Sequence, residues 1–269
     1  MPVSSSLAAI VDLDRYPIDD LGSAAGSDLV ASCRAALDAV GACDLEGFLL
    51  PEAATRATRD ALAMRDDGFR TDASHTIYFD SPMGPAAPEG DPRRTPVRTS
   101  KIGIAYDQIT GSSPLRALYE SDELTAFLAA ALQADPLYRH ADPVGALNVM
   151  IYEPGDEIGW HFDNADFVVT LMLQPAVAGG GFEFVPMLRT ADDENHAGVN
   201  ALLAGGREGV RAMSAAPGTL ALFRGRRSPH RVLPVEGDVS RVIAVLAYAD
   251  VPDARLTERT LELFYGRTG

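Results

Sequence analysis

The fold of this chain is decided by the stretch Asn148-Val-Met-Ile-Tyr152-Glu-Pro-Gly-Asp-Glu-Ile158-Gly-Trp-His161-Phe-Asp163. Its β-branched and aromatic residues are typical of strands, and the Pro-Gly pair predicts a turn between two of them. Residues i and i+2 of a strand share one face. We therefore expect the imidazole of His161 and the carboxylate of Asp163 to lie side by side, where both could bind one metal ion.

Short runs of the same composition continue along the chain, separated by Gly, Pro and Asn rather than by helical patterns of about 10–15 residues. Such close spacing predicts an antiparallel sandwich, barrel or jelly roll rather than a parallel α/β sheet. The predicted strands are Leu147–Tyr152, Phe167–Gln174, Gly181–Val185, Thr219–Phe223, Arg231–Val235 and Val242–Tyr248. Residues 190–212 are predicted to form an inserted loop with a short helix at Val199–Leu203.

Helical patterns flank this region, at residues 27–41, 51–64, 114–133 and Thr257–Phe264. Because no linker divides the chain, we expect a single domain over residues 1–269, mainly β with flanking helices (α+β). Within this domain we expect residues 1–143 to form the helical support and lid region, 144–250 the β-barrel core, and 251–269 the C-terminal helix.

Residues 80–97 form a long loop in this scheme. The loop is rich in Pro and Gly, which excludes regular structure. Long loops in compact domains are either functional lids or segments without fixed structure, and we favour a lid.

Charge and cysteine content narrow the class of protein. The 269 residues include 23 Lys and Arg against 38 Asp and Glu, a net charge of −15. A surface this acidic repels phosphates, so nucleic acid and anionic membranes are not expected partners, whereas a cationic small molecule would be attracted. No apolar run of about 20 residues predicts a membrane span. With only two cysteines and no secretion signal, we expect a cytoplasmic protein.

The five histidines supply a candidate for the third metal ligand. His230 precedes a predicted strand, and Arg241 begins the next one. Two histidines and one carboxylate form the facial triad of non-haem Fe(II) oxygenases, which leaves three coordination positions open. A bidentate 2-oxoacid and O2 would fill those positions, and an arginine suits the far carboxylate of the 2-oxoacid.

At this point the sequence resembles a known superfamily. The first stretch quoted above, the run Gly179-Gly180-Gly181, His230 and Arg241 together resemble the Fe(II)/2-oxoglutarate-dependent oxygenases over about residues 147–248. A closer likeness is to the group of BesD-type free-amino-acid halogenases and their hydroxylase relatives. It rests on Trp160-His-Phe-Asp-Asn-Ala-Asp-Phe167, Leu171-Met-Leu-Gln174, Phe182-Glu-Phe-Val-Pro186, Leu222-Phe-Arg-Gly-Arg226, His230-Arg-Val-Leu-Pro-Val235 and Phe264-Tyr-Gly-Arg267.

The resemblance implies a double-stranded β-helix and assigns roles to residues. It makes His161, Asp163 and His230 the iron ligands and Arg241 the partner of the 2-oxoglutarate tail carboxylate. Tyr152 is expected to bind the same co-substrate, and Asn148 is a second candidate from the same motif. Core packing is the alternative for both.

Position 163 separates two reactions within the group. The halogenases have Gly or Ala there, and chloride binds the iron in the space left. Because this chain has Asp163, the resemblance implies a hydroxylase that uses Fe(II), 2-oxoglutarate and O2. A halogenase or a desaturase of the same superfamily is the alternative.

The substrate is expected to be a small polar molecule, in particular a free amino acid, cationic or neutral, or another amine-bearing metabolite. Candidate substrate residues flank the loop or follow the metal motif: His75, Tyr78, Arg98, Asn164 and Asp166. Surface or packing roles are the alternatives for each. A function of another class also fits the motif, namely a cupin-like metal-binding module without oxygenase activity, but such a module has no need of Arg241.

Overall fold

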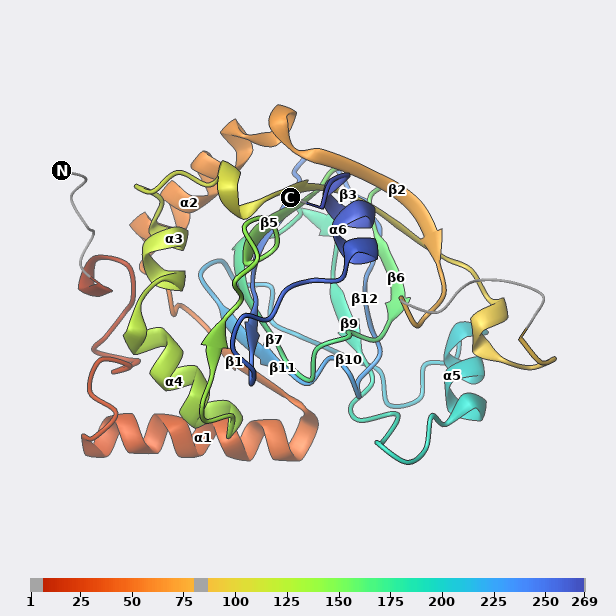
Figure 1. Ribbon diagram of the computed structural model, residues 1–269, viewed down its shortest axis with the longest axis horizontal. Helices are drawn as coiled ribbons and strands as arrows, with labels where there is room; N and C mark the ends of the chain where they lie inside the picture. Colours follow the sequence, from red (N-terminus) through yellow and green to blue (C-terminus); the bar gives the residue numbers. More distant parts are fainter. Residues whose placement is uncertain (1–6, 80–86, 269) are drawn as a thin grey trace.

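One curled antiparallel sheet of eleven strands dominates the computed structural model, which describes residues 7–79 and 87–268 (Figure 1). Ten strands follow the order β1-β11-β7-β14-β5-β3-β6-β12-β9-β10, and β2 pairs with β3 outside this path. Their bounds are β1 Ala42–Leu45, β2 Phe69–His75, β3 Val97–Ile104, β5 Leu147–Tyr152, β6 Ile158–His161, β7 Val168–Gln174, β9 Phe182–Phe184, β10 Arg211–Ala212, β11 Leu220–Phe223, β12 His230–Val232 and β14 Arg241–Leu246.

Two short ribbons complete the β structure. They pair β13 Val235–Glu236 with β8 Ala178–Gly179, and β15 Tyr248–Ala249 with β4 Tyr138–Arg139. The predicted run Arg231–Val235 is thus divided between β12 and β13, because Pro234 has no N–H to continue a strand ladder. The mainly β prediction is confirmed, and the curl of the sheet is consistent with a jelly roll.

The described residues contain six α-helices: α1 Ala24–Val40, α2 Pro51–Ala63, α3 Pro114–Tyr119, α4 Asp122–Leu132, α5 His196–Leu203 and α6 Glu258–Tyr265. Single 3-10 turns lie at Leu7–Ala9, Arg65–Asp67, Pro92–Arg94 and Tyr106–Gln108. The prediction of one helix over residues 114–133 was wrong. The Ser121 hydroxyl accepts a hydrogen bond from the Leu124 N–H and starts a new helix there.

Alternation along β5 separates the two faces of the sheet. Leu147, Val149 and Ile151 enter the main hydrophobic core, which α1 to α4 cover from outside. Asn148 and Tyr152 point to the opposite face, where they line a cavity of about 490 Å³. One face of the sheet therefore packs into the hydrophobic core, and the other face lines a cavity that can hold a ligand.

The sheet takes more from the N-terminal part of the chain than the sequence predicted. β3 lies between β5 and β6 in the middle of the sheet, and β1 forms one end of the strand order. The helical-support region of residues 1–143 therefore supplies strands to the β core. β3 escaped prediction because its residues lack the hydrophobic alternation of an amphipathic strand.

Helix α6 packs against β2 and β3 on the cavity side of the sheet, and Leu263, Phe264 and Tyr265 line the cavity. Of the lid predicted over residues 80–97, residues 80–86 lie outside the described part, and the remainder contains a 3-10 turn and the start of β3. In the part of the chain that the structure describes, no helix is long and apolar enough to cross a membrane.

Candidate metal centre

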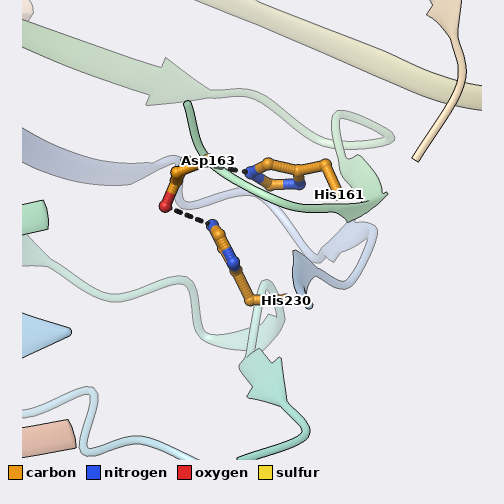
Figure 2. A group of neighbouring side chains, drawn as sticks. All are labelled: His161, Asp163 and His230. Carbon is orange, nitrogen blue, oxygen red and sulfur yellow. Dashed lines mark ion pairs between the residues drawn. The ribbon is translucent and has the colours of Figure 1, made fainter. Parts of the chain in front are cut away.

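Three side chains from two strands meet at one end of the cavity (Figure 2). His161 ends β6, Asp163 follows two residues later, and His230 begins β12, which pairs with β6 so that the two histidines face each other in register. The candidate ligand atoms of the three residues all lie within 4.8 Å of one another. The H-x-D spacing and the pairing of β6 with β12 together produce this convergence.

Backbone carbonyls orient both imidazoles. The Nδ1 atom of His161 lies 2.8 Å from the Gly159 carbonyl oxygen, and that of His230 lies 3.0 Å from the Ser228 carbonyl oxygen. A carbonyl can only accept, so each Nδ1 carries the proton and each Nε2 offers a lone pair. Burial, followed by the neighbouring His230, holds the pKa of His161 well below its usual value, so its ring stays neutral.

The resulting arrangement brings acceptors together without a donor. His230 Nε2 lies 3.3 Å from Asp163 Oδ2, and His161 Nε2 lies 3.9 Å from Asp163 Oδ1. Among the described residues, Asp163 Oδ2 is buried and has no hydrogen-bond partner. Buried lone pairs that face one another are costly unless a cation lies between them. The three residues therefore fit a divalent metal with open positions, of the kind that binds Fe(II).

Gly225 makes room for the carboxylate, a role that the sequence did not reveal. A Cβ atom on residue 225 would lie 1.7 Å from Asp163 Oδ2 and 2.7 Å from its Cγ. The Asp163 N–H also donates to the Gly225 carbonyl oxygen at 3.2 Å. The close approach of this backbone fixes the position of Asp163.

Arg241 is the largest side chain that is almost completely buried, at 2% exposure. It begins β14 beside Tyr152 of β5, and its guanidinium carbon lies 5.4 Å from the Tyr152 ring centroid. Its Nη1 atom is buried and makes no hydrogen bond within the described part of the chain. A buried guanidinium with a free donor beside a cavity fits a bidentate carboxylate.

Two other predicted co-substrate residues line the same cavity. Burial raises the pKa of Tyr152 to about 12, so its hydroxyl remains a neutral donor. The Oδ1 atom of Asn148 is buried and lacks a partner among the described residues. The Tyr152 hydroxyl can therefore donate a hydrogen bond to a ligand that Arg241 anchors, whereas the free Asn148 Oδ1 atom accepts one.

The five candidate substrate residues divide into three groups. Asn164 and Asp166 line the cavity, and Asp166 pairs with Arg226 at 2.8 Å. His75 and Tyr78 do not line it: His75 lies behind His161, with ring centroids 6.3 Å apart, and Tyr78 stacks on Phe162. Arg98 does not line the cavity either and pairs with Asp72 at 3.1 Å.

Two cavity residues were missed by the sequence analysis. His140 was given no role in the sequence analysis, yet it is half-buried and lines the cavity. Lys101 of β3 was not singled out, although it is only 4% exposed and lines the cavity. The available signal was composition, since Lys101 is the one lysine among the 23 basic residues.

Trp160 and Arg231 pack against each other beside the metal ligands. Arg231 pairs with Glu183 at 2.7 Å and lies over the Trp160 ring, 4.6 Å from its centroid. Trp160 packs behind the metal ligands and does not line the cavity. These contacts hold the outer side of β6 and β12.

A family model supplies the identification. The model described as Halogenase D matches residues 92–264, which include every candidate ligand and most of the sheet. The chain belongs to the Halogenase D family. None of the curated proteins compared with the chain matches it.

Solved structures show how widely the fold of this Halogenase D member is shared. AviO1 from Streptomyces viridochromogenes Tue57 is 23% identical, with 84% of this chain and 96% of that chain covered and a TM-score of 0.55. The non-haem α-ketoglutarate-dependent epimerase SnoN from nogalamycin biosynthesis is 14% identical, with coverages of 83% and 82% and a TM-score of 0.56. A Pseudomonas putida prolyl-4-hydroxylase is 15% identical, with coverages of 81% and 97% and a TM-score of 0.50. This chain thus shares its fold with an α-ketoglutarate-dependent epimerase and a prolyl-4-hydroxylase.

Proposed function

We propose that this protein is an Fe(II)- and 2-oxoglutarate-dependent dioxygenase with a double-stranded β-helix core. The proposal rests on two groups of buried polar atoms that line one cavity and lack partners among the described residues. Three acceptor side chains converge without a cation, and Arg241 offers a buried donor without an anion. An iron ion would bind the three acceptor side chains, and the tail carboxylate of 2-oxoglutarate would accept hydrogen bonds from Arg241.

In this proposal, iron held by His161, Asp163 and His230 would supply the activation of O2, and the overall reaction of 2-oxoglutarate, O2 and substrate would give succinate, CO2 and a hydroxylated substrate. His161, Asp163 and His230 hold the metal on one side and leave three positions open. Arg241 orients the co-substrate from the far end, with Tyr152 and Asn148 beside it. The apolar ring of Phe79, 4.7 Å from the His161 ring, helps to keep water from the centre.

We propose hydroxylation as the reaction, with a small polar molecule such as a free amino acid as substrate. The Asp163 carboxylate fills the coordination position that chloride would need. Membership of the Halogenase D family makes chlorination the second candidate, and desaturation would use the same metal centre. The buried Arg241 is the feature that a cupin-like module without oxygenase activity would not require.

An anaerobic absorbance titration tests the proposal. Addition of Fe(II) and then 2-oxoglutarate should produce a visible charge-transfer band, since both the triad and a bidentate 2-oxoacid are needed for it. Compounds that then shift the band are taken into oxygen, and products are identified by mass. Absence of the band from protein that has bound iron would exclude the oxygenase and favour a metal-binding module.

A further inference from the structure

The one lysine of the chain lies inside the cavity. The other basic residues are arginines, and most charged side chains face solvent, yet Lys101 is 4% exposed. It lies on the cavity side of β3, whose alternate residues Ile102 and Ile104 enter the opposite core. A residue type that is almost never fully buried unless paired is therefore placed where a ligand can reach it.

The ammonium group has an aromatic neighbour but no anionic partner. Lys101 Nζ lies 3.9 Å from the centroid of the Phe264 ring, a cation–π contact from α6. Within residues 7–79 and 87–268, it forms no hydrogen bond and no ion pair. Burial lowers the pKa of Lys101 to about 7, although the Asp163 charge opposes that effect. An ammonium with three donors gains most from a carboxylate at this place.

Lys101 and Arg241 serve different ends of the cavity. The positive charge of Lys101 acts on Asp163 and on the imidazole of His161, whereas the charge of Arg241 acts on Tyr152. A chain of aromatic contacts joins Lys101 to the metal ligands: Phe264 lies 5.5 Å from Phe79, which lies 4.7 Å from His161. Lys101 therefore lies by the metal centre and apart from the residues that would hold the 2-oxoglutarate tail.

The other charges of the cavity leave Lys101 unopposed. Asp163 serves the metal, and Asp166 is paired with Arg226 at 2.8 Å. The remaining acidic residue of the lining is Asp250. It is exposed, as are two arginines of the same lining, Arg255 and Arg259. The interior thus calls for an anion, although the net charge of the whole chain is −15.

We propose that Lys101 binds a carboxylate of the primary substrate beside the metal ligands. This inference rests on the proposed oxygenase function and narrows its substrate to a carboxylate-bearing small molecule, with the α-carboxylate of a free amino acid as the specific candidate. A free amino acid is a zwitterion. Its ammonium group is attracted by the acidic surface, and its carboxylate is attracted by the cationic interior.

A single lysine allows a direct test. Protein grown with [ε-13C]lysine gives one side-chain signal, that of Lys101, and Zn(II) in place of Fe(II) keeps the spectrum free of paramagnetic broadening. The Zn(II) protein is first saturated with 2-oxoglutarate, with binding measured by calorimetry. It is then titrated with each standard L-amino acid and with the amide of every amino acid that binds.

The expected result is that 2-oxoglutarate binds without moving the Lys101 signal, and that an amino acid moves it while its amide does not. In Lys101→Met, affinity for that amino acid should fall roughly 10–100-fold, the effect of one lost charge-assisted hydrogen bond, with 2-oxoglutarate affinity within twofold of the parent. A shift caused by 2-oxoglutarate alone would make Lys101 a co-substrate residue and overturn the inference. So would equal binding of acid and amide, or a signal that no amino acid moves. Failure of 2-oxoglutarate to bind at all is a separate outcome, which instead rejects the proposed function.

Discussion

Gly225 and Asp163 approach so closely that no side chain fits between them: a Cβ on residue 225 would lie 1.7 Å from the Asp163 Oδ2 atom. The backbone of one segment thus sets the position of a candidate metal ligand on another. A hydrogen bond from the Asp163 N–H to the Gly225 carbonyl oxygen also joins the two backbones and keeps these residues adjacent.

The first prediction concerns this contact. Gly225→Ala should displace the Asp163 carboxylate and reduce metal affinity by roughly 10–100-fold, the usual cost of disturbing the support of a ligand. Isothermal titration with Fe(II) or Mn(II) measures it. Gly111→Ala is a matched control, since nothing lies within 4 Å of a Cβ there. Equal metal affinity in Gly225→Ala and the parent would mean that Asp163 does not bind the metal.

The second prediction concerns the ligand itself. Asp163→Gly should reduce hydroxylation by at least roughly 100-fold, since removal of a ligand exceeds the loss of its supporting contacts. It also opens one coordination position, so reactions with added chloride should be analysed for chlorinated product. Asp192→Gly, which removes an exposed carboxylate outside the cavity lining, is the control. If Asp163→Gly hydroxylates as well as the parent, the carboxylate is not a ligand.

The third prediction concerns the co-substrate. Arg241→Ala should weaken 2-oxoglutarate binding roughly 10–100-fold while leaving metal affinity nearly unchanged, because a charge-assisted bidentate contact is lost. Calorimetry on anaerobic, metal-loaded protein measures both affinities, and a thermal melt establishes that the variant is folded. Arg98→Ala, which loses ion pairs with Asp72 and Glu157 and a hydrogen bond to the Gly155 carbonyl oxygen, should bind 2-oxoglutarate as the parent does. Unchanged 2-oxoglutarate affinity in Arg241→Ala would show that another residue binds the tail.

The fourth prediction concerns pH. Burial lowers the pKa of His75 to about 4, although a hydrogen bond with the Thr76 carbonyl opposes this. The unfolded chain takes up the proton near pH 6.5, so the stability contributed by the neutral ring is complete above that pH and is lost as the pH falls towards 4. The loss amounts to at most about 3 kcal/mol.

Denaturant unfolding of metal-free protein between pH 7 and pH 4 measures this effect. The variant His75→Gln cannot take up the proton, so it should lose less stability than the parent over that interval. Parallel curves for the two proteins would mean that His75 keeps an ordinary pKa in the folded state. An NMR titration of the His75 ring, assigned through the variant, gives the pKa directly.

The sequence predicted the mainly β fold and the convergence of His161, Asp163 and His230, because the period of two along a strand fixes which side chains share a face. It did not predict the place of β3, since pairing between distant strands leaves no local signal. Lys101 and Gly225 were missed for related reasons. The burial of one and the close contact of the other depend on segments that meet only in the folded chain.

The position of α6 has a consequence for how this molecule can change. His161 and His230 of the candidate metal centre lie on β6 and β12, whereas Leu263, Phe264 and Tyr265 of α6 line the cavity beside Lys101. Substitutions at Leu263 or Phe264 alter the room available to a substrate and leave every candidate ligand untouched. The candidate metal ligands and this part of the cavity wall therefore come from separate segments. A library of variants restricted to α6 would change the selection of substrate and keep the candidate metal ligands.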